Sequence, residues 1–112
     1  MLNSLDNRNV CKSILFQYCN VLEIKDTPRL IFYKKDILEL PYSDRKGGAN
    51  TKKLCGCYYT ESNVIYINLK NHSSRKQLID TIIHELIHKV SECKLPHGEM
   101  FDNMIKLISS LE

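Results

Sequence analysis

A His-Glu-x-x-His pattern occurs in the C-terminal half of the chain, at His84, Glu85 and His88. In a helix, residues four apart lie one above the other, so both imidazoles would project from one face and could bind the same metal ion. Glu85 would lie about 100° further round the helix, close enough to polarise a water molecule at that ion. The pattern therefore predicts a metal site with a general base beside it.

The residues around this pattern predict an amphipathic helix over about residues 74–93. With His84 at 0° on a helical wheel, His88 falls at about 40° and the apolar side chains fill an arc from roughly 120° to 300°. The two faces are separate, which favours metal binding over a pair of surface histidines beside a helix salt bridge. Ser74 and Gln77 have the spacing of a capping box, which indicates where the helix begins. The apolar positions are Leu78, Ile79, Ile82, Ile83, Leu86, Ile87 and Val90.

A catalytic zinc site needs a third protein ligand, and four residues outside the pattern are candidates. Glu92 continues the helical series, but it lies two turns from the first histidine, about 12 Å along the axis. His72 precedes the helix and lies near its far end. His97 and Glu99 follow a break at residues 94–96, where the chain can turn back and open a second helix against the first. We favour His97, with Glu99 in reserve; the alternative is that His97 is an exposed histidine in a turn.

Zn²⁺ is the ion that nitrogen ligands in a tetrahedral arrangement favour, although the affinity order of divalent metals does not by itself exclude copper or nickel. If such a site hydrolyses a peptide bond, Glu85 would accept the proton of the attacking water and pass it to the leaving amine. A further group that stabilises the oxyanion would be useful, and the candidates for this contact with substrate are Tyr58, Tyr59 and Tyr66. Tyrosine in a strand is more often a packing residue, so none of the three is preferred.

The elements that would position these residues form a small α+β fold. Residue patterns predict a packing helix over about 6–21, a strand over 29–33, a short helical turn over 34–40 and a last helix over about 98–111. Two further strands, over 54–60 and 64–69, flank a turn at 61–63 and predict an antiparallel hairpin. We expect one domain, residues 1–112, with a mixed or antiparallel three-stranded sheet packed on the N-terminal helix, the His-Glu-x-x-His helix and the C-terminal helix.

Together these residues resemble the SprT-like metallopeptidases, the family that includes Spartan. In that family a third histidine follows after a variable gap, in a His-Gly-x-x-aromatic motif. The resemblance covers about residues 55–105 and implies a minimal zincin-like domain, a zinc-dependent peptidase that acts on a protein or peptide substrate. Zincin-type peptidases bind the substrate backbone along an edge strand above the active-site helix, and the hairpin would supply that edge. The residues that carry the resemblance are His84, Glu85, His88, His97, Gly98 and Phe101.

DNA is a partner that the resemblance also implies, because Spartan-like enzymes act on proteins crosslinked to DNA and are stimulated by DNA. The polar segment 41–53 is basic, and it could contact a phosphate backbone or an acidic partner; the alternative is a solvated loop. Two other functions stay open: a metal-stabilised DNA-binding module without peptidase activity, and an interaction domain that binds no metal. Glu85 favours the enzyme, since a purely structural site needs no base. The basic residues are Arg45, Lys46, Lys52 and Lys53.

Composition indicates an ordinary globular domain. The chain has 112 residues, a formal net charge of +3 and a sequence pI of about 8.6, short of the excess that would predict nucleic-acid binding unaided. The first ten residues lack the apolar segment of a signal peptide, and no run is long enough to span a membrane. We therefore expect the five cysteines to be free thiols in the cytoplasm or nucleus. Cys55 and Cys57 alone offer too few thiolates for a structural zinc site.

Overall fold

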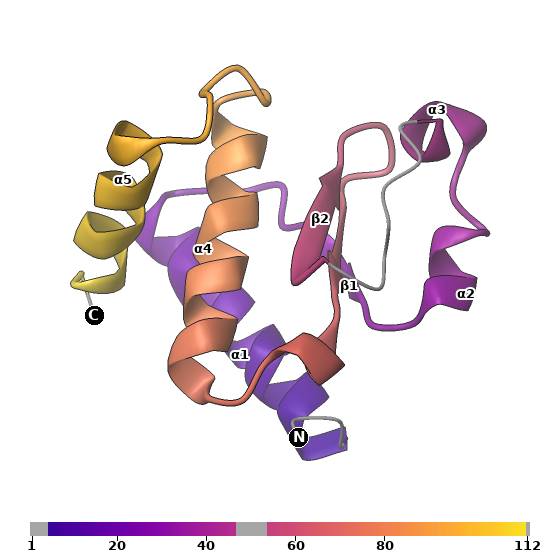
Figure 1. Cartoon of the computed structure of the whole chain (residues 1–112), viewed down its shortest axis with the longest axis horizontal. Helices are drawn as coiled ribbons and strands as arrows, with labels where there is room; N and C mark the ends of the chain where they lie inside the picture. Colours follow the sequence, from indigo (N-terminus) through magenta and orange to yellow (C-terminus); the bar gives the residue numbers. More distant parts are fainter. Residues whose placement is uncertain (1–4, 47–53, 112) are drawn as a thin grey trace.

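The computed structural model describes residues 5–46 and 54–111, which form five α-helices and a three-stranded sheet. Figure 1 shows α4 and α5 side by side, with the sheet on the other side of α4. The N-terminal part comprises α1 (Leu5–Val21), β1 (Arg29–Ile31), α2 (Lys34–Ile37) and α3 (Tyr42–Arg45). The C-terminal part comprises β2 (Gly56–Tyr59), β3 (Val64–Ile67), the 3₁₀ turn η1 (Leu69–Asn71), α4 (Arg75–Val90) and α5 (Glu99–Ser109).

The sheet is mixed, with the strand order β1-β3-β2. β1 runs parallel to β3, with Arg29 opposite Val64, and β2 runs antiparallel to β3, with Gly56 opposite Ile67. The predicted hairpin and the predicted small sheet are therefore confirmed. Because β2 pairs with β3 on one side only, β2 is an edge strand of this sheet.

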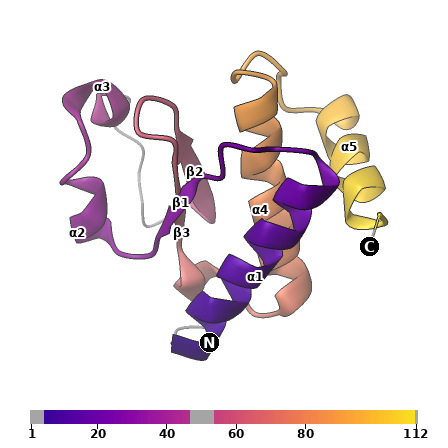
Figure 2. The same ribbon diagram turned by 180° about the vertical axis from the view of Figure 1, so that it is seen from behind.

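The main hydrophobic core lies between the sheet and two helices, α1 and α4, which cover the same face of the sheet (Figures 1 and 2). β3 is buried on both faces, and its alternate residues Ile65 and Ile67 point into this core. Tyr18 of α1 and Leu86 of α4 are also completely buried there. The burial of four or more large side chains around β3 fixes the position of α4 relative to the sheet.

The opposite face of the sheet carries a second, smaller core. Val64 and Tyr66 of β3 pack there with Ile31 of β1 and with residues of α2 and the segment that follows it. The segment 41–53, expected to be a polar loop, contains α3 in its described part. The two carboxylate oxygens of Asp44 in α3 accept hydrogen bonds from the backbone N–H groups of residues 61 and 62 in the β2–β3 turn, at 2.9 and 3.0 Å. These contacts hold α3 against the turn.

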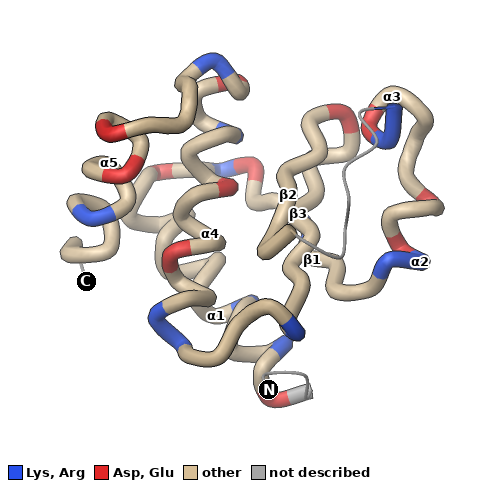
Figure 3. The backbone as a smooth tube through the Cα atoms, viewed as in Figure 1, with Lys and Arg blue, Asp and Glu red and all other residues tan. Residues whose placement is uncertain are grey.

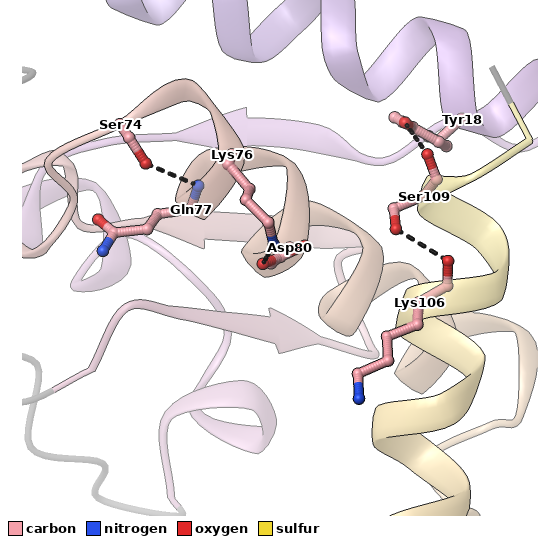
Figure 4. Close-up of polar contacts among 7 residues, drawn as sticks. All are labelled: Tyr18, Ser74, Lys76, Gln77, Asp80, Lys106 and Ser109. Atoms are coloured by element: carbon pink, nitrogen blue, oxygen red, sulfur yellow. Dashed lines mark hydrogen bonds and ion pairs between the residues drawn. The ribbon is translucent and has the colours of Figure 1, made fainter.

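α4 begins where the sequence predicts. The Ser74 hydroxyl accepts a hydrogen bond from the Gln77 backbone N–H at 3.2 Å (Figure 4), and the Gln77 side chain accepts one from the backbone N–H of Ser73 at 2.6 Å. The helix ends at Val90, earlier than the predicted end near residue 93. Val90 was expected on the apolar face, but it is 49% exposed because the chain leaves the core at this residue.

α5 packs against α4, where Phe101 contacts the rings of His84 and His88, and Ile108 of α5 is buried in the main core. Its C-terminal end also lies near α1, where the Tyr18 hydroxyl donates a hydrogen bond to the Ser109 carbonyl oxygen at 3.5 Å (Figure 4). α5 is therefore held at both ends: its first turn lies over α4, and its last turn lies beside α1. This arrangement fixes the start of α5 at Glu99, two residues after His97.

The charged residues are spread along the described chain, with acidic and basic positions interspersed (Figure 3). Lys76 and Asp80 form an exposed ion pair on the first turns of α4, with 3.0 Å between the ammonium and carboxylate (Figure 4). Exposed pairs of this kind contribute little to stability. Among the described helices, none combines the length and the apolar character needed to cross a membrane.

β2 lies close to α4 at a glycine, and this leads to a testable prediction. A Cβ atom at Gly56 would lie 2.9 Å from Thr81 Cγ2 and 2.9 Å from the backbone oxygen of Tyr66. We expect Gly56→Ala to lower the free energy of unfolding by about 1–3 kcal/mol, because strand and helix must separate to admit the methyl group. Urea unfolding, followed by circular dichroism, measures this change.

Thr81→Ser provides the control, since it removes Cγ2 and keeps the hydroxyl. In the double variant we expect part of the loss caused by Gly56→Ala to be recovered, because one of the two close contacts is gone. Strictly additive effects of the two substitutions would show that the Thr81 methyl group is not the obstacle.

Candidate metal centre

Two histidines of α4 project from the same side of the helix, as their spacing requires. The Nε2 atoms of His84 and His88 are 3.2 Å apart, and the ring centroids are 4.8 Å apart. Both side chains are partly exposed, whereas the neighbouring Leu86 and Ile87 are completely buried. The separation of apolar and histidine faces that the helical wheel predicted is present in the structure.

A sharp reversal of the chain brings a third histidine to the first two. After α4 ends, Glu92 and Cys93 both have positive φ angles, of 54° and 60°. The Cys93 backbone N–H donates a hydrogen bond to the His88 carbonyl oxygen at 2.7 Å, which closes the turn over the end of α4. Gly98 then adopts φ 153°, a conformation that residues with a Cβ rarely adopt, and α5 begins at the next residue. His97 is thereby directed back toward α4.

The three imidazoles meet at their Nε2 atoms. Nε2 of His97 lies 3.0 Å from Nε2 of His88, and one ligand atom from each of His84, His88 and His97 lies within 4.8 Å of the others. At the usual zinc–nitrogen distance of about 2.0–2.1 Å, the nitrogens of a tetrahedral site are about 3.3 Å apart. The observed separations of 3.0 and 3.2 Å are close to this value. Three lone pairs can converge in this way around a cation, and the donor set therefore fits a metal ion such as Zn²⁺.

Phe101 forms the floor beneath the three imidazoles. The centroid of its ring lies 4.5 Å from that of His84, and 5.0 Å from those of His88 and His97. Phe101 is 1% exposed, so water does not reach the ring that lies beneath the imidazoles. Contact between the ring and all three imidazoles restricts their rotation.

The histidines of α4 are held in the neutral form that metal ligation requires. Burial, followed by the nearby charges of His88 and His97, lowers the pKa of His84 to about 4, with Asp102 acting in the opposite direction. Burial and the charge of His97 also lower the pKa of His88. His88 Nδ1, the ring nitrogen that does not face the cluster, is buried without a hydrogen-bond partner among the described residues, at a cost of about 1–3 kcal/mol to the folded state.

Glu85 lies beside the cluster, and its side chain is almost completely buried. Its Oε2 atom is 3.9 Å from His84 Nε2. Burial raises the pKa of Glu85 to about 7, and a hydrogen bond from the backbone N–H of Tyr58 acts in the opposite direction. A carboxylate with a pKa near neutrality, next to three converging nitrogens, is suited to accept and return a proton.

The other ligand candidates from the sequence lie outside this cluster. His72 is 3% exposed, and both ring nitrogens are hydrogen-bonded at 2.7 Å, to the Asn68 carbonyl oxygen and to the Thr81 hydroxyl. Glu92 is exposed and pairs with a lysine at 3.4 Å. Glu99 is exposed on the first turn of α5, and it is not part of the group of potential ligands among the described residues.

The three tyrosines that were candidates for substrate contact are divided between the two faces of the sheet. Tyr59 and Tyr66 are buried in the smaller core, on the face away from α4, so the structure does not bring them to the histidines. Tyr58 lies on the α4 side, where its hydroxyl donates a hydrogen bond to Asn63 Oδ1 at 2.9 Å. Of the three candidates, Tyr58 is therefore the tyrosine on the side of the site, and its backbone N–H donates a hydrogen bond to Glu85.

The basic residues expected to contact DNA are only partly described. Arg45 ends α3, where its Nε donates a hydrogen bond to the Leu40 carbonyl oxygen at 2.8 Å. Lys46 follows as the exposed C-cap of α3. Lys52 and Lys53 lie outside the described residues. The nucleic-acid contact at these four positions stays a prediction.

Two residues beside the site, Asn63 and Lys89, were not singled out from the sequence. Lys89 Nζ donates a hydrogen bond to Asn63 Oδ1 at 2.8 Å, between the end of α4 and the β2–β3 turn. The available signal was the spacing of Thr81, Glu85 and Lys89, which form a polar stripe at intervals of four in a largely apolar helix. Asparagine in a short turn is also typical of a positive φ angle, and Asn63 has φ 53°.

The fold is similar to that of a known metallopeptidase. The crystal structure of the metallopeptidase zymogen jannalysin from Methanocaldococcus jannaschii matches with a TM-score of 0.56 and 18% sequence identity, over 87% of this chain and 79% of that chain. No protein-family model matches the sequence, and a search of curated proteins found no relative. The likeness shows a metallopeptidase-like α+β fold, in agreement with the predicted minimal zincin-like domain.

The geometry predicts a metal stoichiometry that depends on His97. We expect the purified chain, reconstituted with zinc, to bind about one ion per molecule, and His97→Ala to bind clearly less, because two imidazoles remain. Elemental analysis after removal of unbound metal measures both values. His72→Asn is the control, since His72 lies outside the cluster.

Zinc retained fully in His97→Ala would exclude His97 as a ligand. Glu99 would then be the candidate for the third ligand. Zinc absent from the unaltered chain, after reconstitution, would show that the three histidines converge without holding a metal.

Proposed function

We propose that this chain is a zinc-dependent endopeptidase with a site formed by His84, His88, His97 and Glu85. The observation that carries the proposal is the convergence of three imidazole nitrogens, at 3.2 and 3.0 Å, beside a buried carboxylate on the same helix. The likeness to a metallopeptidase zymogen supports the same reaction class. A purely structural metal site would need neither the carboxylate nor its position next to the ligands.

Zinc held by the three imidazoles would supply Lewis acidity, polarising a substrate carbonyl and making water more acidic. The chain's own contribution is to orient the ligands and move the proton. Glu85, with Oε2 3.9 Å from His84 Nε2, accepts a proton from the attacking water and transfers it to the amine nitrogen that leaves. Phe101 keeps water from the core side of the imidazoles, which strengthens the electrostatic interactions within the site.

The edge strand β2 supports a peptide in extended conformation as the substrate. The Cys55 carbonyl oxygen accepts a hydrogen bond from the Asn68 backbone N–H at 2.9 Å, and the antiparallel register continues from this pair through β2. Alternation along the ladder turns the backbone groups of Gly56 and Tyr58 away from β3. The Tyr58 N–H is directed to Glu85, so the backbone groups offered to an added strand are those of Gly56 and the Tyr58 carbonyl oxygen. Main-chain groups at the free edge can pair with an added strand whatever its side chains, so we propose a protein or peptide substrate bound by strand addition.

Replacing Glu85 with Gln tests the assigned base. We expect Glu85→Gln to lower the cleavage rate of an unstructured protein substrate by about 10²–10⁴-fold, because the amide cannot accept the proton. Zinc content, measured on the same samples, should not change. Glu99→Gln is the matched control, since Glu99 is exposed and outside the cluster.

Cleavage by Glu85→Gln at the rate of the unaltered chain would remove Glu85 from the mechanism. Zinc binding without any cleavage by the unaltered chain would favour the alternative function, a metal-stabilised binding or interaction module without peptidase activity.

A DNA-bound protein as the substrate is a narrower proposal that rests on the basic residues of segment 41–53. It predicts that DNA accelerates cleavage of a DNA-binding protein, and that added salt reverses this acceleration, because phosphate contacts are released. Gel assays with and without DNA measure the effect, and a free peptide serves as the control substrate. Robust cleavage of the free peptide, with none of the DNA-bound protein, would limit the proposal to DNA-independent peptidase activity.

A further inference from the structure

A second polar stripe on α4 faces the edge strand. Thr81, Glu85 and Lys89 follow each other at intervals of four residues, so they share one side of the helix, next to the side that carries the histidines. Thr81 lies close to Gly56, where a Cβ atom would be 2.9 Å from the Thr81 methyl group. Glu85 accepts a hydrogen bond from the backbone N–H of Tyr58. The position of β2 along this stripe therefore determines where that N–H lies relative to the carboxylate.

Asn63 joins the third residue of the stripe to the strand. Its Oδ1 accepts hydrogen bonds from Lys89 Nζ at 2.8 Å and from the Tyr58 hydroxyl at 2.9 Å. Its Nδ2 donates a hydrogen bond to the carbonyl oxygen of Asp26 at 3.2 Å. Lys89 Nζ also lies 3.5 Å from Asp26 Oδ2 and 5.9 Å from the centroid of the Tyr58 ring. One side chain thus connects α4, β2 and the segment before β1.

The burial of Lys89 makes this connection necessary. The Lys89 side chain is 14% exposed, whereas its carboxylate partner Asp26 is 84% exposed. An ammonium group withdrawn from water needs hydrogen-bond acceptors within the protein, and a flexible exposed carboxylate provides a weak one. Lys89 Nζ lies 2.8 Å from Asn63 Oδ1 and 3.5 Å from Asp26 Oδ2, so Asn63 is the principal partner of this cation.

We propose that Asn63 is a positioning residue of the site, which holds the edge strand in place on α4 so that the backbone of Tyr58 orients Glu85. This inference rests on the proposed peptidase function, because it assigns Asn63 a role in the same reaction. Asn63 acts through Tyr58 and Lys89, and it does not itself contact the three histidines. A displacement of β2 along the helix would move the Tyr58 N–H away from the carboxylate and leave the histidine cluster intact.

Asn63→Gly and Asn63→Asp are the test variants. Asn63 has φ 53°, which glycine adopts without strain, so Asn63→Gly removes the side chain and preserves the turn. Aspartate also tolerates this conformation, and its carboxylate can accept the hydrogen bonds from Lys89 and Tyr58. Asn63→Asp loses the donor to the Asp26 carbonyl oxygen, so it should restore the part of the positioning that depends on Lys89 and Tyr58.

Lys89→Met tests the same connection from the helix, since methionine fills a similar space without the ammonium group. Lys76→Met is the matched control on the same helix. Lys76 is 84% exposed and pairs only at the surface with Asp80, so its replacement should leave every readout unchanged.

Two readouts separate positioning from general stability. In Asn63→Gly we expect kcat/KM for peptide cleavage to fall by about ten- to a hundredfold at unchanged zinc content, as displacement of a catalytic group by roughly 1 Å would predict. We also expect faster amide hydrogen exchange at Tyr58, measured by nuclear magnetic resonance, while amides in the middle of α4 keep their protection. Asn63→Asp should recover most of both effects.

The proposal is overturned if Asn63→Gly cleaves as fast as the unaltered chain, or if Tyr58 exchanges at the same rate in both. It is also overturned if the amides of α4 and β2 lose protection together, or if Asn63→Asp is no better than Asn63→Gly, since either result indicates a general loss of stability. If the unaltered chain binds zinc but cleaves nothing, the proposed function fails, and the positioning role of Asn63 in catalysis fails with it. Amide exchange then still shows whether Asn63 holds β2 on α4.

Discussion

Burial of the apolar arc of α4 fixes the rotation of this helix about its axis, and the geometry of the site depends on that rotation. Ile82, Ile83, Leu86 and Ile87 are each 0% exposed. Burial of one such side chain contributes about 1.5–3 kcal/mol, more than a typical single hydrogen bond returns. The histidines and the polar stripe are therefore oriented by the core. The polar contacts of these side chains are weaker, and they adjust the site without setting the rotation of α4.

Local patterns were sufficient to predict α4, its N-cap and the side from which His84 and His88 project, because helical periodicity and capping act over a few residues. The path of the chain to His97 was predicted only as a turn. Its form depends on positive φ angles at Glu92 and Cys93, two residue types with no strong preference for that conformation. The turn is stabilised by contacts that form only in the folded protein, in particular the packing of the three imidazoles on Phe101.

The sheet shows a second limit of prediction from sequence. Adjacent residues of a strand point to opposite faces, so Tyr58 borders the site while Tyr59 is buried on the far face. The sequence indicates this alternation, but it does not indicate which face α4 covers. The parallel pairing of β1 with β3 and the helix α3 also depend on partners distant in sequence, such as the turn that Asp44 binds. Periodicity within a short segment contains no information about such partners.

The strand order β1-β3-β2 also has a consequence for the growing chain. β2, β3 and α4 follow one another closely, whereas Arg29 of β1 pairs with Val64 and donates its backbone N–H to the Asn63 carbonyl oxygen at 3.1 Å. Closing such a long loop has an entropic cost, so parallel pairing follows the local hairpin. During synthesis, β1 and the apolar side of α1 are made before β3 and α4. The N-terminal third of the protein must therefore remain unpaired until the segment that carries the site has been made.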